Sequence, residues 1–474
     1  MAKNLLSAKS KDISQWYTSV IKLADLADYG PSKGTMIIKQ YGYAIWEYIQ
    51  SAIDKDIKKK GVENAYFPIF IPMSFLEKEQ DHVEGFAPEL AVVTHGGGEK
   101  LEENLVVRPT SETIMYDSYS RWVHSWRDLP ILMNQWCNVV RWEKRTMPFI
   151  RTSEFLWQEG HTAHASHNEA VEYQTWAMNM YASVYRDHFA IDGYVGWKST
   201  AERFAGADST LTYESLMPSG KTLQSCTSHD LGQNFAKPFD IKYQDKDGGD
   251  SYVWQTSWGF STRSIGGLIL SHGDDNGLVL PPKLAPTQAV IIPVKPEPQI
   301  LEYCAELKQI LDSADIRTKL DIRDDETFGF KINKWEVKGA PLILKIGGRE
   351  AENKTVTIKR RFDGQEISAT LAELSEVVTN QLSDIQVSML EKSKKFIAEN
   401  TREAKTYDEF KAILAEHKGF IKVCWNDNPE IEKIIKEETK AKTSCCPVDW
   451  PEVDGVDFYT GEPATKQWLF AQSY

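Results

Sequence analysis

The chain has 474 residues, 41% of them hydrophobic and 26% charged, which is typical of a globular protein with room for about three domains. Its 55 basic and 68 acidic residues give a net charge of −13, which excludes nucleic-acid binding driven by overall charge, and no DNA partner is expected. No apolar run approaches the roughly 20 residues of a membrane span, so no membrane association is expected. The N-terminus lacks the apolar core of a secretory signal and the six cysteines are scattered, which favours a cytoplasmic location.

The first elements are two amphipathic helices. Apolar residues from Ile13 to Ile21 recur at helical spacing, and isoleucines recur every fourth residue in a second helix expected over 41–60, which Gly61 ends. An extended run follows over 64–72, where two prolines exclude a helix. Further along, the Trp- and Val-rich run 135–143 predicts a buried strand.

A proline-rich segment, 280–286, marks the clearest domain boundary. Short apolar strands alternate with a helix after it, which predicts a small α/β domain. A mostly helical stretch, 371–415, then leads to a small α+β C-terminal module. The domains are therefore expected at 1–283, 284–380 and 381–474. The strands are expected at 289–294, 316–320, 342–346 and 355–358, and the helix at 300–314.

One stretch of the middle domain is basic despite the acidic whole. Between Lys331 and Arg361 lie nine basic and three acidic residues. This run is either an RNA-binding patch or the solvated face of an α/β domain, and charge alone does not separate the two.

Arg141 and Glu143 lie two residues apart on the strand predicted over 135–143, so both side chains are expected on one face. Charged groups on a strand of Trp, Cys and Val require a ligand or a partner. An internal salt bridge is the alternative to a ligand. The charged and aromatic stretch 144–161 that follows favours a polyanion site beside an apolar pocket.

Three separated segments resemble the signature motifs of class II aminoacyl-tRNA synthetases. The helix from Tyr41 with the run to Pro68 resembles the dimer-forming first motif, Arg141-Trp-Glu143 with its hairpin the second, and Trp258–Gly266 the third. Within that class the chain resembles prolyl-tRNA synthetases of the archaeal and eukaryotic-like type over its whole length. The segments that carry this resemblance are Arg108-Pro-Thr-Ser-Glu112, Phe155–His161, Thr227-Ser-His229 and His272–Pro282.

The resemblance implies a homodimer with an antiparallel catalytic sheet flanked by helices, which activates L-proline with ATP and Mg²⁺ and transfers it to tRNA(Pro). It implies that Arg141 and Arg263 are catalytic and contact the α- and γ-phosphates of ATP. A planar, permanently charged guanidinium suits phosphate oxygens. The other residues implied for ATP binding are Glu143, Arg151, Gln224, Thr227 and Ser261.

Proline needs an anion for its secondary ammonium and an apolar wall for its ring. The resemblance assigns the anion to Glu112 with Thr110. Thr110 could instead cap the helix expected from Ser111, and Trp157 could be a core residue. The other residues implied for proline binding are Arg141, Trp157, Glu159, His161, His229, Ser257 and Gly259.

No metal site is expected. His161, His164 and His167 recur every three residues, but no Cys or carboxylate pattern completes a zinc signature. Relatives carry four C-terminal cysteines around zinc. This chain keeps Cys424, Cys445 and Cys446 and has Asp457 and Thr460 near the other positions, so a core of Trp425, Trp450, Phe458, Tyr459 and Trp468 is expected instead. The terminal Tyr474 is expected to reach the catalytic domain.

The middle domain resembles the anticodon-binding domain of this class, which favours RNA contact for the basic run and suggests Glu336 as a reader of an anticodon guanine. The roughly 120 residues between Arg141 and Arg263 leave no room for an editing insertion, so activation of alanine without correction is expected. Two alternatives are a class II synthetase for another amino acid, such as threonine, and a catalytically silent RNA-binding relative. The absence of zinc ligands argues against the first, and the presence of the motif residues against the second.

Overall fold

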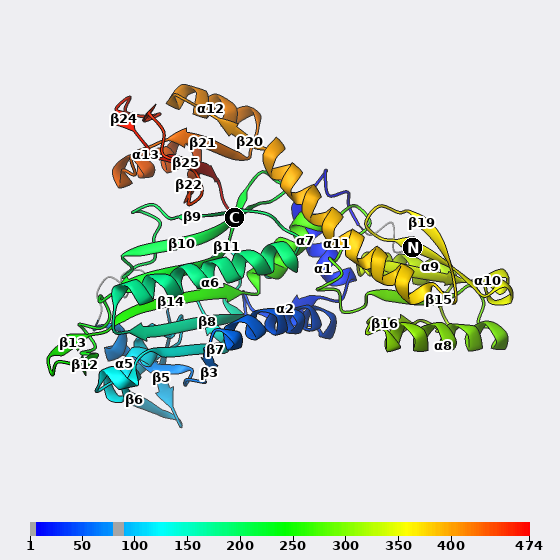
Figure 1. Ribbon diagram of the computed structural model, residues 1–474, viewed down its shortest axis with the longest axis horizontal. Helices are drawn as coiled ribbons and strands as arrows, with labels where there is room; N and C mark the ends of the chain where they lie inside the picture. The colour runs from blue at the N-terminus through cyan, green and yellow to red at the C-terminus, as the bar shows by residue number, and fades with distance from the viewer. Residues whose placement is uncertain (1–5, 79–89) are drawn as a thin grey trace.

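The computed structural model describes residues 6–78 and 90–474. An eleven-stranded sheet runs through the catalytic and C-terminal regions, and the middle domain lies beside it with its own five-stranded sheet (Figure 1). No helix in the described part of the chain is long and apolar enough to cross a membrane. The expected fold class is confirmed: an antiparallel catalytic sheet with flanking helices, an α/β domain and a small α+β module.

The catalytic strands follow the order β9-β10-β11-β14-β8-β7-β3, antiparallel except for the β3–β7 pair. Their alternating buried residues form the floor on which the site is built. The bounds are β3 (Glu63–Asn64), β7 (Ile131–Val140), β8 (Glu154–His164), β9 (Tyr194–Trp197), β10 (Ser209–Leu216), β11 (Thr222–Gly232) and β14 (Trp254–Ser261).

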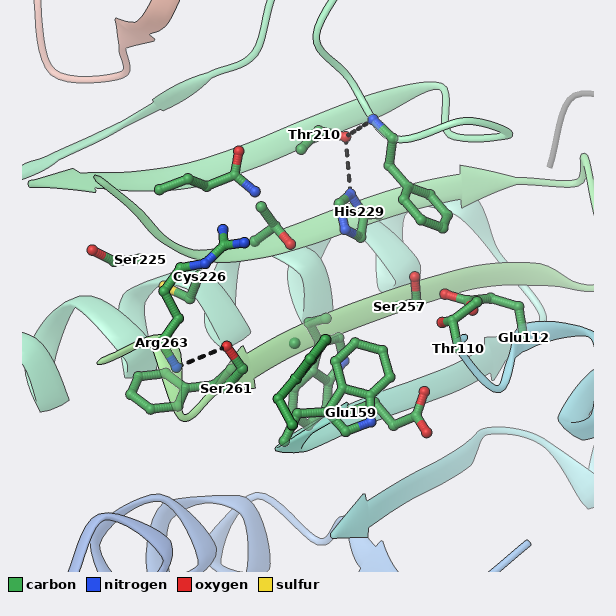
Figure 2. Close-up of a pocket in the computed structure, with 18 of the residues that line it drawn as sticks. Thr110, Glu112, Glu159, Thr210, Ser225, Cys226, His229, Ser257, Ser261 and Arg263 are labelled. Carbon is green, nitrogen blue, oxygen red and sulfur yellow. Dashed lines mark hydrogen bonds between the residues drawn. The ribbon is translucent and has the colours of Figure 1, made fainter. Parts of the chain in front are cut away.

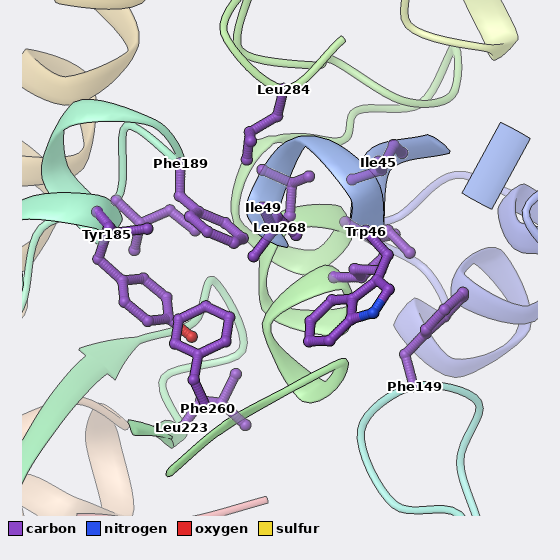
Figure 3. Close-up of a cluster of buried hydrophobic side chains, with 14 of the residues drawn as sticks. Ile45, Trp46, Ile49, Phe149, Tyr185, Phe189, Leu223, Phe260, Leu268 and Leu284 are labelled. Atoms are coloured by element: carbon purple, nitrogen blue, oxygen red, sulfur yellow. The ribbon is translucent and has the colours of Figure 1, made fainter. Parts of the chain in front are cut away.

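Helices cover this sheet and fill the main core. Trp46 of α2, Tyr185 of α6 and Leu268 of α7 belong to this core, together with Phe260 of β14 (Figure 3). These apolar positions recur at helical spacing in the sequence, so burying that stripe stabilises helix and sheet together. The bounds are α1 (Ile13–Leu23), α2 (Gln40–Lys59), α3 (Met73–Leu76), α5 (Glu112–Trp122), a short 3₁₀ helix (Trp126–Asp128), α6 (His167–Asp187) and α7 (Arg263–His272).

Three small sheets decorate the catalytic region. The first is a hairpin of β1 (Ala27–Tyr29) and β2 (Met36–Ile38). The second joins β4 (Phe70–Pro72), β5 (Ala91–Gly96) and β6 (Glu99–Val107), and the third is a hairpin of β12 (Lys242–Gln244) and β13 (Asp250–Tyr252).

The strand that leads to Arg141 lies earlier in the chain than predicted, from Ile131 to Val140 instead of 135–143. β7 ends at Val140, so Arg141 and Glu143 lie in the loop after the strand and do not share a strand face. The pairing of β7 with β8 stops at Val140–Glu154, and the loop folds back so that Arg141 N donates to Ser153 O. The prediction failed because Trp142 is 60% exposed, although the sequence pattern treats it as a buried strand residue.

The middle domain has the strand order β16-β15-β17-β18-β19, parallel among the first three and antiparallel afterwards. The predicted strand 342–346 is confirmed, and the others differ at their ends by up to two residues. The bounds are β15 (Ala289–Pro293), β16 (Thr318–Leu320), β17 (Leu342–Ile346), β18 (Thr355–Arg360), β19 (Glu366–Thr370), α8 (Pro298–Ser313), α9 (Phe328–Val337) and α10 (Gly348–Asn353).

The long helix α11 (Leu374–Glu399) runs from the middle domain to the C-terminal module (Figure 1). The module continues the catalytic sheet, because β22 pairs with β9 through Cys446–Trp197 and Pro447–Gly196. The bounds are β20 (Thr401–Glu403), α12 (Tyr407–Glu416), β21 (Phe420–Cys424), α13 (Pro429–Thr439), β22 (Ala441–Pro447), β23 (Gly455–Val456), β24 (Pro463–Ala464) and β25 (Gln467–Gln472).

Four of the five aromatic residues expected in the core of this module meet there: Trp425, Phe458 and Trp468 are buried and Tyr459 packs against them. The prediction for Trp450 was wrong. Its ring packs edge-on against Tyr194 of β9, in a second cluster between the module and the catalytic sheet.

Candidate active site

One cavity of about 270 Å³ opens on the catalytic sheet between α5 and α7. Side chains from β8, β11 and β14 line its floor, and Thr110 and Glu112 close one end while Arg263 closes the other (Figure 2). All nine residues predicted for proline line this cavity, as do five predicted for ATP. The set is Thr110, Glu112, Arg141, Trp157, Glu159, His161, Gln224, Thr227, His229, Ser257, Gly259, Ser261 and Arg263.

Three arginines converge at one end. Arg141, Arg151 and Arg263 line a smaller cavity of about 150 Å³ that shares Arg141, Phe155 and Arg263 with the first. Burial lowers the pKa of Arg263, and the like charges of Arg141 and Arg151 lower it further. Guanidinium groups held this close favour an anion between them. The end with Arg263 is therefore suited to a polyanion.

The arginines are held by the backbone of the surrounding loops. Arg141 Nε donates to Pro109 O at 3.0 Å and Arg263 Nε donates to Ile150 O at 3.1 Å. Both side chains line the two cavities, so these backbone contacts hold them at the edge of the site. Glu143 is the fourth charged residue that lines the smaller cavity, and its carboxylate forms an ion pair with Arg151 at 3.1 Å.

The other end of the main cavity is acidic. Glu112, Glu159 and His161 are all buried, and one ligand-type atom from each lies within 4.8 Å of the others. Burial alone would lower the pKa of His161, but Glu159 and Glu112 outweigh it and raise that pKa. Two carboxylates therefore face one imidazole at this end of the cavity.

The two carboxylates differ in their surroundings. Glu159 accepts hydrogen bonds from Ser111, Gln135 and His161, which fix its position. Glu112 accepts from Thr110 Oγ1, which is its one side-chain donor among the described residues. Thr110 therefore orients Glu112 and does not cap α5. The N-cap residue of this helix is Ser111, whose side chain makes no capping hydrogen bond.

Trp157 is a wall of the cavity as well as a packed residue. Its indole Nε1 donates to Cys137 Sγ at 3.2 Å, and Arg141 lies 5.5 Å from its ring centroid. Ser257, on β14, is 2% exposed, and its hydroxyl has no hydrogen-bond partner in the described structure. A ligand with a polar group in the cavity would satisfy this hydroxyl.

The sequence analysis missed a second wall, formed by Glu202, Phe204 and Thr210. The ring of Phe204 stacks on His229 with centroids 4.5 Å apart, and its backbone N–H donates to Thr210 Oγ1, which is hydrogen-bonded to His229 Nδ1 at 2.9 Å (Figure 2). Burial lowers the pKa of His229 to about 3. Glu202 and Phe204 lie in a connection without periodicity before β10, so the pattern offers no signal for them.

The three histidines spaced by three residues do not come together. His161 faces Glu159, His164 contacts Glu169 at 3.4 Å, and His167 contacts Asp230 at 2.6 Å. On a strand, positions three apart point to opposite faces, which separates His161 from His164.

The end of the chain lies against the catalytic sheet. Tyr474 N donates to Thr222 O at 3.1 Å, and its hydroxyl is hydrogen-bonded to Ser219 at 2.9 Å. Within the C-terminal module, Asp457 accepts hydrogen bonds from the backbone N–H groups of Asn426, Tyr459 and Thr460. A carboxylate thus organises this turn.

The basic run of the middle domain is largely neutralised. Glu336, on α9, pairs with Lys359 at 2.6 Å, and Arg361 forms a bidentate pair with Asp274 of the catalytic region. Seven of the nine basic side chains have a carboxylate partner, so much of the charge stabilises the fold. They are Lys334, Lys338, Lys345, Lys354, Lys359, Arg360 and Arg361.

Comparison with known families agrees with this architecture. Residues 94–272 match the tRNA synthetase class II core domain (G, H, P, S and T), 288–381 the anticodon binding domain, and 407–474 the C-terminal domain of prolyl-tRNA synthetase. The fold and the site therefore define a class II aminoacyl-tRNA synthetase.

Relatives and solved structures narrow the class. The chain is 47% identical to a proline–tRNA ligase of Rubrobacter xylanophilus, over 99% of the chain and 98% of the relative. It is 48% identical to one of Porphyromonas gingivalis over the full length of both. A crystal structure of the prolyl-tRNA synthetase from Cryptosporidium parvum, complexed with halofuginone and AMPPNP, has a TM-score of 0.95 at 39% identity and covers 100% of this chain and 98% of that chain.

The chain belongs to the proline–tRNA ligase family. It is an enzyme that activates proline with ATP and joins it to tRNA(Pro), releasing AMP and diphosphate. The alternatives of a threonine-specific synthetase and of a silent RNA-binding relative are therefore set aside. Residues 141–263 are all described and form strands and helices of the catalytic region, with no separate editing domain among them.

Proposed function

We propose that the main cavity holds proline at its acidic end and the α-phosphate of ATP beside Arg141, with the rest of the triphosphate between Arg151 and Arg263. The observation that carries this proposal is the convergence of three arginines at one end of a cavity whose other end holds the two buried carboxylates of Glu112 and Glu159. Such a cavity matches a zwitterionic imino acid next to a polyanion. The AMPPNP bound to the Cryptosporidium relative supports the same arrangement.

The reaction then needs no general base. An ionised proline carboxylate attacks the α-phosphorus, diphosphate leaves, and prolyl-adenylate forms. Arg141 and Arg263 neutralise the charge that develops on the phosphate oxygens, because their guanidinium groups are already positioned before the reaction. In the second step a ribose hydroxyl of tRNA attacks the prolyl carbonyl and AMP leaves.

The proline ring is proposed to lie between Trp157 and Phe204, with its ammonium on Glu112 and its carboxylate directed toward Arg141. Gly259 lines the same wall beside Trp157. A Cβ added to Gly259 would lie 3.5 Å from the Trp157 ring, so the glycine leaves room next to that ring. The pocket excludes larger side chains by size. It cannot exclude alanine in that way, because each missing methylene is worth only about 1–3 kcal/mol.

Around ATP, we assign Gln224, Thr227 and Ser261 to the nucleotide wall. A Mg²⁺ ion would offset part of the charge of the triphosphate. Glu143 is the carboxylate that lines the smaller cavity beside the arginines, so it is the side chain that would contact such an ion or the adenine end.

We propose a homodimer in the cytoplasm. Large apolar side chains are exposed on the β1–β2 hairpin and on the segments that resemble the dimer-forming motif, which supports a protein interface there. They are Tyr29, Ile37, Tyr43, Tyr66 and Phe70. The six free cysteines support a reducing compartment. Sedimentation of the chain at twice its mass of 54.0 kDa would support the dimer.

We also propose the domain limits 1–283, 284–380 and 381–474, although the last limit falls within α11. In the middle domain, Glu336 is proposed to read an anticodon base after exchanging its partner Lys359. Glu336→Gln should then lower transfer to tRNA and leave prolyl-adenylate formation unchanged.

The decisive experiment is ATP–diphosphate exchange with a panel of amino acids. Exchange should be strongest with proline, weaker with alanine and at background with threonine. Alanyl-tRNA formed by the purified enzyme should persist, because no editing activity is expected. Stronger exchange with threonine than with proline would contradict the proposed pocket. Hydrolysis of added alanyl-tRNA would contradict the expected lack of editing.

A further inference from the structure

The wall of the cavity that contains Glu202 and Phe204 belongs to the connection between β9 and β10, residues 198–208. This connection has turns but no helix or strand of its own. Loops of this kind are usually mobile unless other groups hold them. The contacts that hold residues 198–208 therefore determine where Glu202 and Phe204 lie in the wall of the cavity.

The start of the connection is anchored by a buried carboxylate of the C-terminal module. Ser199 Oγ donates to Glu432 of α13 at 2.8 Å and is hydrogen-bonded to Thr443 Oγ1 of β22 at 2.9 Å. Thr443 N also donates to Glu432, at 3.1 Å. Ser199 and Thr443 are 0% exposed and Glu432 is 2% exposed, so these hydrogen bonds are shielded from water.

Three further contacts tie the connection to the same module. Lys198 Nζ donates to Ser444 O at 3.0 Å, and Thr200 N and Oγ1 donate to the Asp427 carboxylate. Glu202 pairs with Lys436 at 3.2 Å and with Lys442. Lys198, Ser199, Thr200 and Glu202 are thus four anchor points that reach α13, β22 and the loop before α13, and β22 lies beside β9 (Figure 1).

The other end of the connection enters the cavity. Phe204 stacks on His229 and its backbone is fixed by Thr210. A displacement of these anchor residues would therefore move Phe204 relative to the residues on β8 and β14 that line the same cavity. The path from Glu432 to the amino-acid pocket is short and continuous.

We propose that the C-terminal module shapes the amino-acid pocket, and that Glu432 is a positioning residue that holds the 198–204 segment through Ser199 and Thr443. The module is thereby part of amino-acid selection. This inference rests on the proposed location of proline in the main cavity.

The test compares Glu432→Gln with Glu438→Gln in the full-length enzyme. Both residues lie on α13, but Glu438 is exposed and accepts a hydrogen bond from Tyr407 instead of from the connection. Loss of hydrogen bonds to a buried carboxylate should raise KM for proline about 10-fold in ATP–diphosphate exchange. KM for ATP should change less than about 2-fold, and the preference for proline over alanine should fall. Glu438→Gln should match the wild type.

A double-mutant cycle with Ser199→Ala shows whether the effect passes through the connection. Ser199→Ala should raise KM for proline in the wild-type background and add little in Glu432→Gln, because both remove the same contact. If Glu432→Gln does not fold, Asp427→Asn removes the exposed anchor at Thr200 and should raise KM for proline more than KM for ATP.

An unchanged KM for proline in folded Glu432→Gln, or equal rises in both KM values, would overturn the inference. Additive effects of Ser199→Ala and Glu432→Gln would also overturn it. A wild-type enzyme without proline-dependent exchange would instead contradict the proposed function, so the two failures are distinguishable.

Discussion

At the scale of single residues, Arg263 shows how the site is tuned. Its guanidinium is buried beside two other positive groups, and burial and like charge both lower its pKa. A like-charged cluster is unfavourable in the empty enzyme and becomes favourable when an anion enters. The like charges therefore do not stabilise the fold by themselves, and they favour an anion at this end of the cavity.

Replacing Arg263 separates charge from shape. Arg263→Gln should lower the rate of ATP–diphosphate exchange about 10²–10³-fold, because it removes a positioned donor to the developing charge. Arg263→Lys should restore only part of that rate, since an ammonium lacks the planar fork. The exposed Arg127→Lys is the control, and wild-type rates in Arg263→Gln would exclude a catalytic role.

The two carboxylates of the pocket should respond differently to amidation. Glu112→Gln should lower kcat/KM for proline about 10–100-fold, as expected for a lost hydrogen bond to a charged group, with little change in the urea midpoint. Glu159→Gln should lower the urea midpoint, because Glu159 holds Ser111, Gln135 and His161 together. Equal loss of stability in the two variants would contradict these separate roles.

Sequence reasoning reached Glu112, Arg141 and Arg263 because they sit in motifs with a recognisable order. It did not reach Phe204 or Glu202, which become pocket residues only when β22 and α13 hold their connection. That hold depends on partners more than 200 residues away in the chain. No local pattern contains this information.

At the scale of elements, hydrophobic periodicity predicted the buried residues correctly where one face of a helix is buried. The isoleucines of α2 at positions 45, 49, 53 and 57 are all 0% exposed, as their spacing predicts. It failed at the end of β7, because an exposed Trp142 and a buried tryptophan look alike in a sequence. Pairing with β8, and not composition, decides where that strand ends.

Gly160 on β8 tests how tightly the catalytic sheet packs. A Cβ at this position would lie 2.2 Å from ring atoms of Trp258, which is 1% exposed on β14. Gly160→Ala should therefore destabilise the enzyme by about 1–3 kcal/mol through overpacking. Its urea midpoint should fall below that of the wild type.

Gly259→Ala is the matched control, one strand away. The nearest atom to its added Cβ would be 3.5 Å distant, an ordinary contact, so its urea midpoint should stay near that of the wild type. Equal midpoints for the Gly160 and Gly259 variants would show that Trp258 can move aside and that the sheet is less tightly packed than the distances indicate.

At the scale of the whole molecule, the modules are joined by specific contacts that composition did not predict. Arg361 of the middle domain binds Asp274 at the end of α7, and Leu278 N donates to Val337 O at the end of α9. β22 makes one sheet of the catalytic region and the C-terminal module. The sequence predicts the three parts, but it contains no pattern for the contacts between them.

Buried histidines of the catalytic region should make the enzyme sensitive to acid. Burial lowers the pKa of His164 and His272 to about 4 and that of His229 to about 3, from an unfolded value of 6.5. Between pH 6.5 and 4 the unfolded chain binds protons that the folded enzyme excludes. The stability from these groups is therefore complete above pH 6.5 and is lost as the pH falls, by up to about 1.4 kcal/mol per pH unit for each histidine. His161, whose pKa is raised, opposes this trend.

His272, at the end of α7, isolates one of these contributions. Its Nε2 donates to Phe189 O at 2.8 Å, and glutamine can keep a donor there without titrating. His272→Gln should therefore reduce the loss of stability between pH 6.5 and 5 by about 2 kcal/mol, measured from urea midpoints at each pH. His417→Gln, at an exposed position, should leave the loss unchanged. Parallel pH profiles for the His272 variant and the wild type would contradict this prediction. They would mean that His272 takes up its proton in the folded enzyme as readily as in the unfolded chain, and that water reaches it at the end of α7.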